Sequence, residues 1–432
     1  MDGEKDLTTT AVEVLVRFKT RYEQYRVTEE SIAIPTRLKR FGLSDIVNHL
    51  LQLPKAIPFD FVLNGQLLRG SLGRSIAAQR LNTESVMELE YMPAMLTPEV
   101  ETDFQAPDWI GALDSGIEGI VFAGSYDGSI TVVSTAGKTL GTAKAHDRAI
   151  KGISVAKQQD SEGGIVATGS QDHSVRLWLT SSLSKRAASV SIDAFAVGRG
   201  HDAEVTDVAI GPTRDVVASC SWDRSVRLWK IPAVDAAGGD GGALKKRKGQ
   251  RGSSSAEQKS METVHTMDAC HTDAVTCVAW ASTRSFYSGS LDRRIHSWDV
   301  ETGQLNTSFH SSHGVSSLGY SPKNSLLASA HPDQCVRLWD PRMKSESSIV
   351  KSFKGHKKFV TDLCWAPYSD NLLASVSHDK TIKVWDTRAD MALHTIDKAH
   401  DDKVLAVDWQ MKSQIVSGGA DKKIVISKTS EK

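Results

Sequence analysis

The stretch HKKFVTDLCWAPYSDNLLASVSHDKTIKVW, residues 356–385, contains the pattern that decides the fold. It opens with His, places an Asp at the turn of a β-hairpin pattern, and ends with a Trp six residues after that Asp. The Asp and Trp pair, or its positional substitute, occurs seven times along the chain. The pairs are Asp172/Trp178, Asp223/Trp229, Asp292/Trp298, Asp333/Trp339 and Asp379/Trp385, with Asp127/Val133 and Asp421/Ser427 as degenerate ends. Such internal repetition indicates a repeat architecture.

Two further residue types accompany six of these pairs. A His precedes the Asp by roughly twenty to twenty-five positions, which is the spacing of WD-type blades, and a hydroxyl residue lies four positions before it. The histidines are His146, His201, His271, His313, His356 and His400; the hydroxyl residues are Thr168, Ser219, Ser288, Ser329, Ser375 and Ser417. We predict a buried relay in which Asp accepts from the His ring, the ring meets the hydroxyl, and the hydroxyl meets the Trp indole N–H.

Ser, His and Asp are also the parts of a nucleophilic triad. A catalytic constellation occurs once in a chain, whereas this set occurs six times at nearly fixed spacing. The first repeat lacks the His, and it has Ala123 for the hydroxyl and Val133 for the Trp, so most of the set is lost together. We therefore interpret the set as structural, and no other motif favours an enzyme.

Alternation of period two marks strands after the His positions, and one repeat reads as one four-stranded blade. The segment Glu99–Phe104 precedes the first full repeat and could supply the outer strand of the last one. Residues 99–428 are therefore predicted to form a seven-bladed WD-repeat β-propeller, closed by its own two ends, so the fold class is mainly β. Closure of this kind covers an exposed sheet edge.

Composition excludes several classes of protein. The 432 residues are 40% hydrophobic, enough for two domains, and 52 basic residues balance 52 acidic ones, so no global field points to nucleic acid or membrane. Five scattered cysteines, Cys220, Cys270, Cys277, Cys335 and Cys364, suit a reducing compartment without disulfides. Neither an apolar run of membrane-spanning length nor a secretory signal is visible, so we expect a soluble intracellular protein.

The longest gap between repeats contains a basic run. The residues that make this gap longer than the others, Ala236–Ser260, are rich in Gly, Ser and Lys, and we predict a disordered loop there. At its centre lie Lys245, Lys246, Arg247 and Lys248. Taken alone, this run is a nuclear-import signal, a contact to the RNA backbone, or a solvated loop.

Two fragments resemble ligand sites but fail on context. Residues 136–139 read Ala-Gly-Lys-Thr, yet a phosphate-binding loop needs Gly where Val132 stands, so a hairpin turn is the better interpretation. Cys270, His271 and Cys277 lack a second ligand pair at zinc-finger spacing. We predict no intrinsic metal and no cofactor.

The residue before each turn Asp should face solvent on one face of the ring. This series contains Tyr126, Trp222, Leu291 and His378. Trp222 and Leu291, on neighbouring blades, would form an aromatic anchor for a partner protein. The alternative is that Trp222 folds onto its own blade.

A separate unit, residues 11–92, precedes the propeller. We predict strands at Val12–Lys19 and Ser31–Ile34, a helix at Ser44–Leu53, then strand Phe59–Leu63 with an Asn-Gly turn. Leu67–Leu68, a short helical stretch and a last strand, Val86–Tyr91, follow. This order is that of a small α+β ubiquitin-like domain, and residues 93–98 are the expected linker.

Two segments of this unit carry a resemblance. The unit resembles the amino-terminal domain of the WD-repeat family of the pescadillo–Bop complex. The similar segments are residues 37–51 (RLKRFGLSDIVNHLL) and 58–72 (PFDFVLNGQLLRGSL). The resemblance spans nearly the whole chain, since the ubiquitin-like module, seven WD repeats and a basic insertion all match.

The resemblance implies a function. Members of the resembled family assemble the large (60S) ribosomal subunit and mature its rRNA in the nucleolus and nucleoplasm. Their propeller binds Bop-type proteins and, through these, pescadillo-type proteins. An acidic residue of the ubiquitin-like domain contacts the metal site of a midasin-type AAA ATPase, which releases the factor from the pre-ribosome. The matching segment, Leu81–Ser85, assigns that role to Glu84. The resemblance also favours nuclear import for the basic run.

Two other functions remain open from the residues. Propellers also serve as substrate adaptors of ubiquitin ligases, which would need a cationic pocket on the ring face. Arg176, Arg227 and Arg337 share one repeat position and are more simply interpreted as packing. Direct RNA binding through the basic loop would be strongly salt-dependent.

Overall fold

The computed structural model describes residues 12–28, 30–157, 163–180, 189–233, 259–268, 270–343, 348–411 and 414–429. The chain divides into two compact units. One comprises the residues up to Thr97 together with Asp386–Asp390 and the residues from Thr429, and the other comprises Pro98–Trp385 and Met391–Lys428. The basic run 245–248 lies outside the described residues. Neither α-helix of the described part is long and apolar enough to cross a membrane.

The amino-terminal unit is a five-stranded sheet covered by two α-helices. Its elements are β1 (Glu13–Lys19), a 3-10 turn (Glu23–Tyr25), β2 (Ser31–Pro35), α1 (Arg40–Leu51), β3 (Phe59–Leu63), β4 (Gln66–Leu67), α2 (Leu72–Gln79) and β5 (Met87–Pro93). The strand order is β2-β1-β5-β3-β4, and the central pair β1 and β5 is parallel. This element order and the parallel central pair agree with the predicted ubiquitin-like domain.

Helix α1 begins four residues before the predicted start at Ser44. Ser44 is buried, and its hydroxyl accepts the Phe59 N–H at 3.0 Å and donates to the Ile57 carbonyl at 3.3 Å, so it joins the helix to β3 and does not cap it. At the true start, Lys39 makes no side-chain cap but forms a β-bridge with Ser71. A tertiary contact therefore sets the helix start. The helix ends because Gln52 adopts a left-handed φ of 50°.

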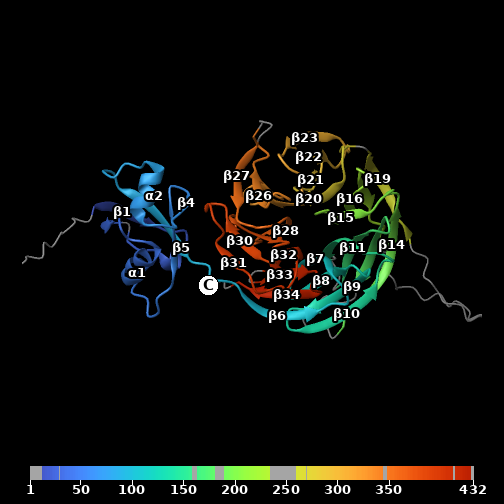
Figure 1. The fold of residues 1–432 in the computed structure, drawn as a ribbon, viewed down its shortest axis with the longest axis horizontal. Helices are drawn as coiled ribbons and strands as arrows, with labels where there is room; N and C mark the ends of the chain where they lie inside the picture. Colours follow the sequence, from blue (N-terminus) through green and yellow to red (C-terminus); the bar gives the residue numbers. More distant parts are fainter. Residues whose placement is uncertain are drawn as a thin grey trace, which may run out of the picture. The chain divides into compact units, whose positions relative to one another are not determined.

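The second unit contains seven sheets that follow one another around a ring (Figure 1). Blade 1 comprises β7 (Ile110–Ile117), β8 (Ile120–Ser125), β9 (Ser129–Ser134) and β10 (Lys138–Lys144); blade 2, β11 (Ile150–Lys157), β12 (Gly164–Ser170), β13 (Ser174–Thr180) and β14 (Ile192–Arg199); blade 3, β15 (Val205–Ile210), β16 (Val216–Ser221), β17 (Val226–Lys230) and β19 (Glu262–Met267). Blade 4 comprises β20 (Val275–Trp280), β21 (Ser285–Ser290), β22 (Arg294–Asp299) and β23 (Leu305–His310); blade 5, β24 (Ser317–Ser321), β25 (Leu326–Ala330), β26 (Cys335–Trp339) and β27 (Ile349–Lys354). Blade 6 comprises β28 (Val360–Trp365), β29 (Leu372–Ser377), β30 (Ile382–Asp386) and β31 (His394–Ile396).

Blade 7 joins the two ends of the ring, as predicted. It combines β32 (Val404–Met411), β33 (Gln414–Gly419) and β34 (Lys423–Lys428) with β6 (Glu99–Gln105). Strand β6 runs antiparallel to β34, from Glu99 opposite Lys428 to Gln105 opposite Lys423. The pairing gives the outer strand partners for its backbone N–H and C=O groups and closes the ring.

The end of the insertion was predicted wrongly. Lys259–Ser260 form the short strand β18, which pairs in parallel with Ala196–Val197 of β14 at the outer edge of blade 2. The prediction of disorder through Ser260 is therefore wrong for these two residues. The prediction considered only the polar side chains of these residues. Their backbone groups, however, form hydrogen bonds with the open edge of the sheet.

Candidate functional site

The loop that carries Glu84 connects α2 to β5 and is anchored at both ends. After α2, Arg80 adopts a left-handed φ of 52° and the Leu81 N–H bonds to the Ile76 carbonyl at 3.1 Å. At the other end, Met87 is buried in the core of the unit. Asn82 braces the middle of the loop, because its side-chain oxygen accepts the Glu84 N–H at 3.0 Å. The Glu84 side chain itself is exposed.

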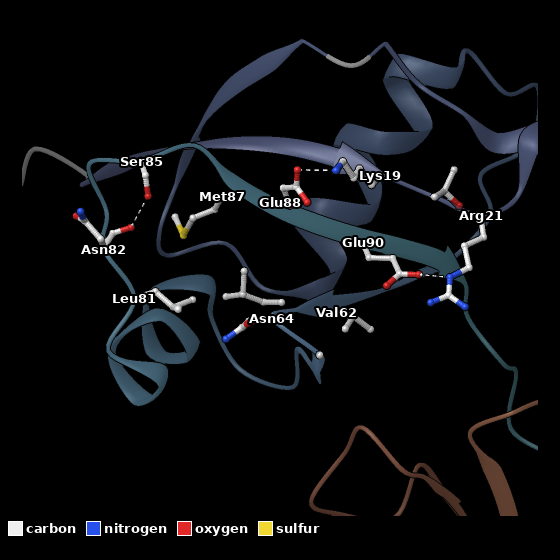
Figure 2. Close-up of a pocket in the computed structure, with 13 residues that line it drawn as sticks. Lys19, Arg21, Val62, Asn64, Leu81, Asn82, Ser85, Met87, Glu88 and Glu90 are labelled. Atoms are coloured by element: carbon white, nitrogen blue, oxygen red, sulfur yellow. Dashed lines mark hydrogen bonds and ion pairs between the residues drawn. The ribbon is translucent and has the colours of Figure 1, made fainter. Parts of the chain in front are cut away.

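A cavity of about 580 Å³ opens beside this loop (Figure 2). Its floor includes Val62, Leu81 and Met87, and its wall carries the Lys19–Glu88 ion pair at 2.5 Å and the Arg21–Glu90 ion pair at 3.0 Å. Asn82 and Ser85 of the Glu84 loop also line it. The loop is thus one rim of a concave surface with an apolar floor and charged edges.

Glu84 has the features that a contact to a partner's cation requires. A divalent cation such as Mg²⁺ binds carboxylate oxygens and keeps positions open for ligands from a second molecule. The backbone of Glu84 is held by Asn82 while its carboxylate projects into solvent. The Glu84 carboxylate is therefore accessible to a metal ion held by a second molecule.

The predicted His relays are assembled in five blades of the propeller. The distance from His Nδ1 to the Asp carboxylate is 2.8 Å in blades 2, 3 and 4, 3.1 Å in blade 6 and 3.0 Å in blade 7. The residues are His146/Asp172, His201/Asp223, His271/Asp292, His356/Asp379 and His400/Asp421. The other ring nitrogen lies 2.7–2.9 Å from the hydroxyl oxygen. In the blades that carry it, the Trp indole N–H donates to that hydroxyl at 2.8–2.9 Å.

The relay tryptophans of blades 2, 3 and 4 are buried where neighbouring blades meet. Trp178 is 4% exposed, Trp229 is 1% exposed and Trp298 is 4% exposed. Each indole belongs to an apolar cluster that combines side chains of its own blade with side chains of the preceding blade. These tryptophans therefore fasten adjacent blades to one another and contribute to the stability of the ring.

The three tryptophans are not equivalent, although the repeat pattern treated them so. The ring of Trp178 lies 6.4 Å from that of the relay residue His146, and the ring of Trp229 lies 6.1 Å from that of His201. In blade 4, the ring of Trp298 lies 5.6 Å from that of His296, which the predicted relay did not include. The predicted relay is complete in blade 4, and a second imidazole, that of His296, is packed beside its Trp298.

Hydrogen bonding keeps the relay carboxylates ionised. Burial would raise the pKa of Asp292, but the bonds from His271 and from the Thr272 and Arg294 backbone N–H groups lower it to about 2. In the relay of blade 2, burial lowers the pKa of His146 more than the neighbouring Asp172 raises it. The relay of blade 2 therefore holds a neutral imidazole against a carboxylate, which is a structural arrangement and not an activated nucleophile.

The relay of blade 5 uses a different histidine from the predicted His313. His331 is fully buried, and its Nε2 lies 2.7 Å from the Ser329 hydroxyl while its Nδ1 lies 2.8 Å from the Gly314 carbonyl. The Trp339 indole N–H donates to the same hydroxyl at 2.7 Å. His313 stays on the surface with its side chain 54% exposed and 3.0 Å from Asp333. The prediction that His313 meets Ser329 is wrong, because His331 already occupies that space.

The ring-face candidates differ in how far they are available to a partner. Trp222 is 55% exposed and Leu291 is 37% exposed. Tyr126 is half-buried beneath the Lys151 ammonium, 4.1 Å from its ring centroid. His378 is half-buried with its ring 5.8 Å from that of Phe359. Trp222 therefore does not fold onto its blade, and it borders a cavity of about 480 Å³.

Comparison with known proteins gives the family. Residues 14–76 match the NLE (NUC135) domain, and residues 137–178, 195–230, 261–299, 303–340 and 347–386 match the WD domain, G-beta repeat. The chain is 33% identical over 427 residues to "Ribosome biogenesis protein WDR12 homolog" of Oryza sativa subsp. japonica, covering 96% of each chain. It is 34% identical over 450 residues to "Ribosome biogenesis protein YTM1" of Kluyveromyces lactis, covering 98% of each. The chain belongs to the WDR12/YTM1 family of ribosome biogenesis proteins.

The five matched WD repeats of this WDR12/YTM1-family chain are those with a complete Asp and Trp pair. Blade 7 and the strands β7, β8 and β9 of blade 1 lie outside the matches, although each of the two blades is a four-stranded sheet. In blade 1, Val121, Ala123 and Val133 are buried in an apolar cluster with Ile424 and Ile426 of blade 7. In blade 1, apolar packing takes the place of the missing relay.

Four aspartates around the central channel were missed by the sequence reasoning. Asp114, Asp207, Asp362 and Asp408 lie on the innermost strands of four blades. Each accepts a backbone N–H from the next element around the ring, at 2.6–3.0 Å. Burial raises the pKa of Asp207 to about 7 and that of Asp362 to about 6. The repeated Val-Thr-Asp at 205–207 and 360–362 was the available signal.

Phe359 and Trp109 are further exposed aromatic residues that the sequence reasoning missed. Phe359 is 54% exposed and Trp109 is 42% exposed. Their carbonyls accept the backbone N–H groups of His378 and Tyr126, so each lies beside a predicted ring-face residue. The sequence reasoning considered only the residue before the turn Asp and not the residue before the first strand of a blade.

Proposed function

We propose that this protein is a non-enzymatic assembly factor of the large (60S) ribosomal subunit that acts in the nucleolus and nucleoplasm. Membership of a family of ribosome biogenesis proteins over nearly the full length of the chain carries the proposal. The propeller scaffolds Bop-type and pescadillo-type proteins, and Lys245–Lys248 direct nuclear import or contact RNA.

The ubiquitin-like unit presents Glu84 to the metal site of a midasin-type AAA ATPase. Three features support this role: the carboxylate is exposed, its backbone is held by Asn82, and a concave surface lies beside it. ATP hydrolysis by the partner then pulls on the bound unit and removes the factor from the pre-ribosome. This chain's own contribution is one oxygen ligand on a braced loop.

Glu84→Ala is expected to abolish capture of the ATPase and leave propeller partners bound. Loss of a ligand to a divalent cation should weaken the contact at least about tenfold, which corresponds to about 1.4 kcal/mol. Wild-type chain and variant are purified from growing cells, partners are identified by mass spectrometry, and extracts are sedimented. The variant should recover the Bop-type and pescadillo-type proteins and accumulate on large-subunit precursors.

Glu23→Ala is the matched control, because Glu23 is also an exposed acid of the same unit. It should behave as wild type. Wild-type recovery of the ATPase by Glu84→Ala would overturn the role of Glu84. Recovery of ubiquitin-ligase subunits without ribosomal precursors would overturn the assembly function as a whole.

Trp222→Ala is expected to weaken capture of the Bop-type partner by roughly 30-fold, the effect of losing a central aromatic anchor of about 2 kcal/mol. The side chain is exposed beside a cavity that Arg148 and Glu204 also line. The measurement is partner recovery at increasing salt. Val350→Ala, in an equally exposed residue on β27, serves as the control. An unchanged yield for Trp222→Ala would remove this residue from the interface.

A further inference from the structure

Blade 4 departs from the other Trp-bearing blades at one position. Two residues before the Trp, the other blades carry a cation: Arg176, Arg227, Arg337 or Lys383. In blades 2 and 5 this cation is paired with the relay Asp, as Arg176 with Asp172 at 3.6 Å and Arg337 with Asp333. Blade 4 has His296 instead. The substitution replaces a cation beside the relay by a group with a lone pair.

His296 is held in an orientation that leaves one nitrogen free to bind. The residue is 4% exposed, and its ring centroid lies 4.1 Å from that of His271. Its buried Nδ1 has no hydrogen-bond partner among the described residues.

The neighbouring donors are suited to one class of metal ion. One ligand atom each from His271, Asp292 and His296 lies within 4.8 Å of the others. Zinc binds imidazole nitrogen at about 2.0–2.1 Å, which places tetrahedral ligands about 3.4 Å apart. The most distant ligand atoms therefore have to approach by up to about 1.4 Å, and His271 Nδ1 and the Asp292 carboxylate, 2.8 Å apart, have to separate by about 0.6 Å. Two imidazoles and one carboxylate favour zinc over magnesium or calcium. We propose that His271, Asp292 and His296 form a zinc site in blade 4.

The surrounding hydrogen bonds already orient the other two ligands. Asp292 accepts the backbone N–H groups of Thr272 at 3.0 Å and Arg294 at 2.8 Å, and its side chain is 2% exposed. His271 Nδ1 lies 2.8 Å from Asp292, and Ser288 lies 2.9 Å from the opposite nitrogen. When zinc takes the place of the Nδ1 proton, that proton moves to Nε2 and the Ser288 oxygen accepts it. The ring stays neutral and no net proton is released.

The zinc site explains a feature that packing alone does not. A buried nitrogen without a partner is unfavourable, and the cations at this position in blades 2, 5 and 6 show none, although Nε of Arg227 in blade 3 is also buried without a partner. The sequence argument against a metal considered His271 with Cys270 and Cys277 and did not include His296. Cys277 instead bonds weakly to the Gly289 carbonyl on β21. The site is independent of the proposed function and would fasten β22 to the segment that precedes β20.

The test uses the full chain, stripped of metal with a chelator and titrated with Co²⁺ as a visible probe and then with Zn²⁺. Wild type should show one tetrahedral Co²⁺ absorption band that Zn²⁺ displaces, and its thermal midpoint should rise with Zn²⁺ as binding favours the folded state. His296→Arg, which restores the cation of the other blades, should lose the band and weaken binding by at least about tenfold.

His310→Ala is the control for adventitious binding, because His310 is an exposed histidine of the same blade. It should keep both the band and the midpoint shift. If circular dichroism shows that His296→Arg is unfolded, His296→Gln, which is neutral and similar in size, replaces it. A band of undiminished intensity in the folded His296 variant, or its absence from wild type, would overturn the site.

Discussion

His356→Ala is expected to lower the free energy of unfolding of the propeller by about 3 kcal/mol, the cost of leaving a buried charged acceptor without its hydrogen-bond donor. The change leaves the Asp379 carboxylate, whose side chain is 6% exposed, without its imidazole. It also leaves the fully buried Ser375 hydroxyl with one fewer partner, although the Trp385 indole still donates to it at 2.8 Å. The measurement is urea denaturation of the full chain, followed by tryptophan fluorescence.

His313→Ala is the matched control within the same repeat series. Its side chain is 54% exposed, and the pairing with Asp333 that it loses is duplicated by Arg337. An exposed ion pair of this kind contributes about 0–1 kcal/mol. The two histidines occupy the same repeat position, so their difference isolates the buried relay. Equal destabilisation by both changes would contradict the assignment of His331, and not His313, to the blade 5 relay.

The number and order of blades could be predicted because the Asp and Trp spacing is a property of the backbone register. Each Asp turn fixes where two strands meet, so seven turns require seven sheets, and the unpaired edge of β34 requires β6. Spacing does not determine which of two nearby histidines turns inward. His331 stands two residues after Ser329, where blade 6 has Ser377, and its burial excludes His313. Side-chain volume, and not spacing, decides that choice.

The candidate site on the amino-terminal unit was predictable only in part. The resemblance places Glu84 on a loop before the last strand, and the structure shows that loop exposed and braced by Asn82. The cavity beside it could not be predicted, since its lining comes from β1, the β3–β4 turn, the Glu84 loop and β5. Likewise, the unpartnered Nδ1 of His296 depends on the packing of His271 above it. Neither feature is local in the sequence.

Asp207→Asn is expected to make the stability of the propeller less dependent on pH between 5 and 7. Burial raises the pKa of Asp207 to about 7, and the Asp362 charge adds to this, while the Val278 and Val208 N–H groups oppose it. An unfolded Asp titrates near 3.9, so between these values the folded state holds a proton that the unfolded state has lost. The stability contributed by this group is therefore complete below about pH 4 and is lost as the pH rises through about 7.

Titration of one such group changes the free energy of unfolding of wild type by up to about 1.4 kcal/mol per pH unit. About half of that value is expected, because Asp207 lines the central channel, where solvent reaches part of its side chain. Urea denaturation of wild type and Asp207→Asn at pH 5, 6, 7 and 8 gives the difference in the free energy of unfolding. The free energy of unfolding of wild type should fall relative to that of Asp207→Asn by about 1–2 kcal/mol between pH 5 and 7, and the difference should then level off. Asp103→Asn, on the exposed face of β6, should change stability by less than about 0.5 kcal/mol at each pH. A difference for Asp207→Asn that is constant from pH 5 to 8 would mean that the carboxyl is already ionised at pH 5, with the backbone N–H groups outweighing burial.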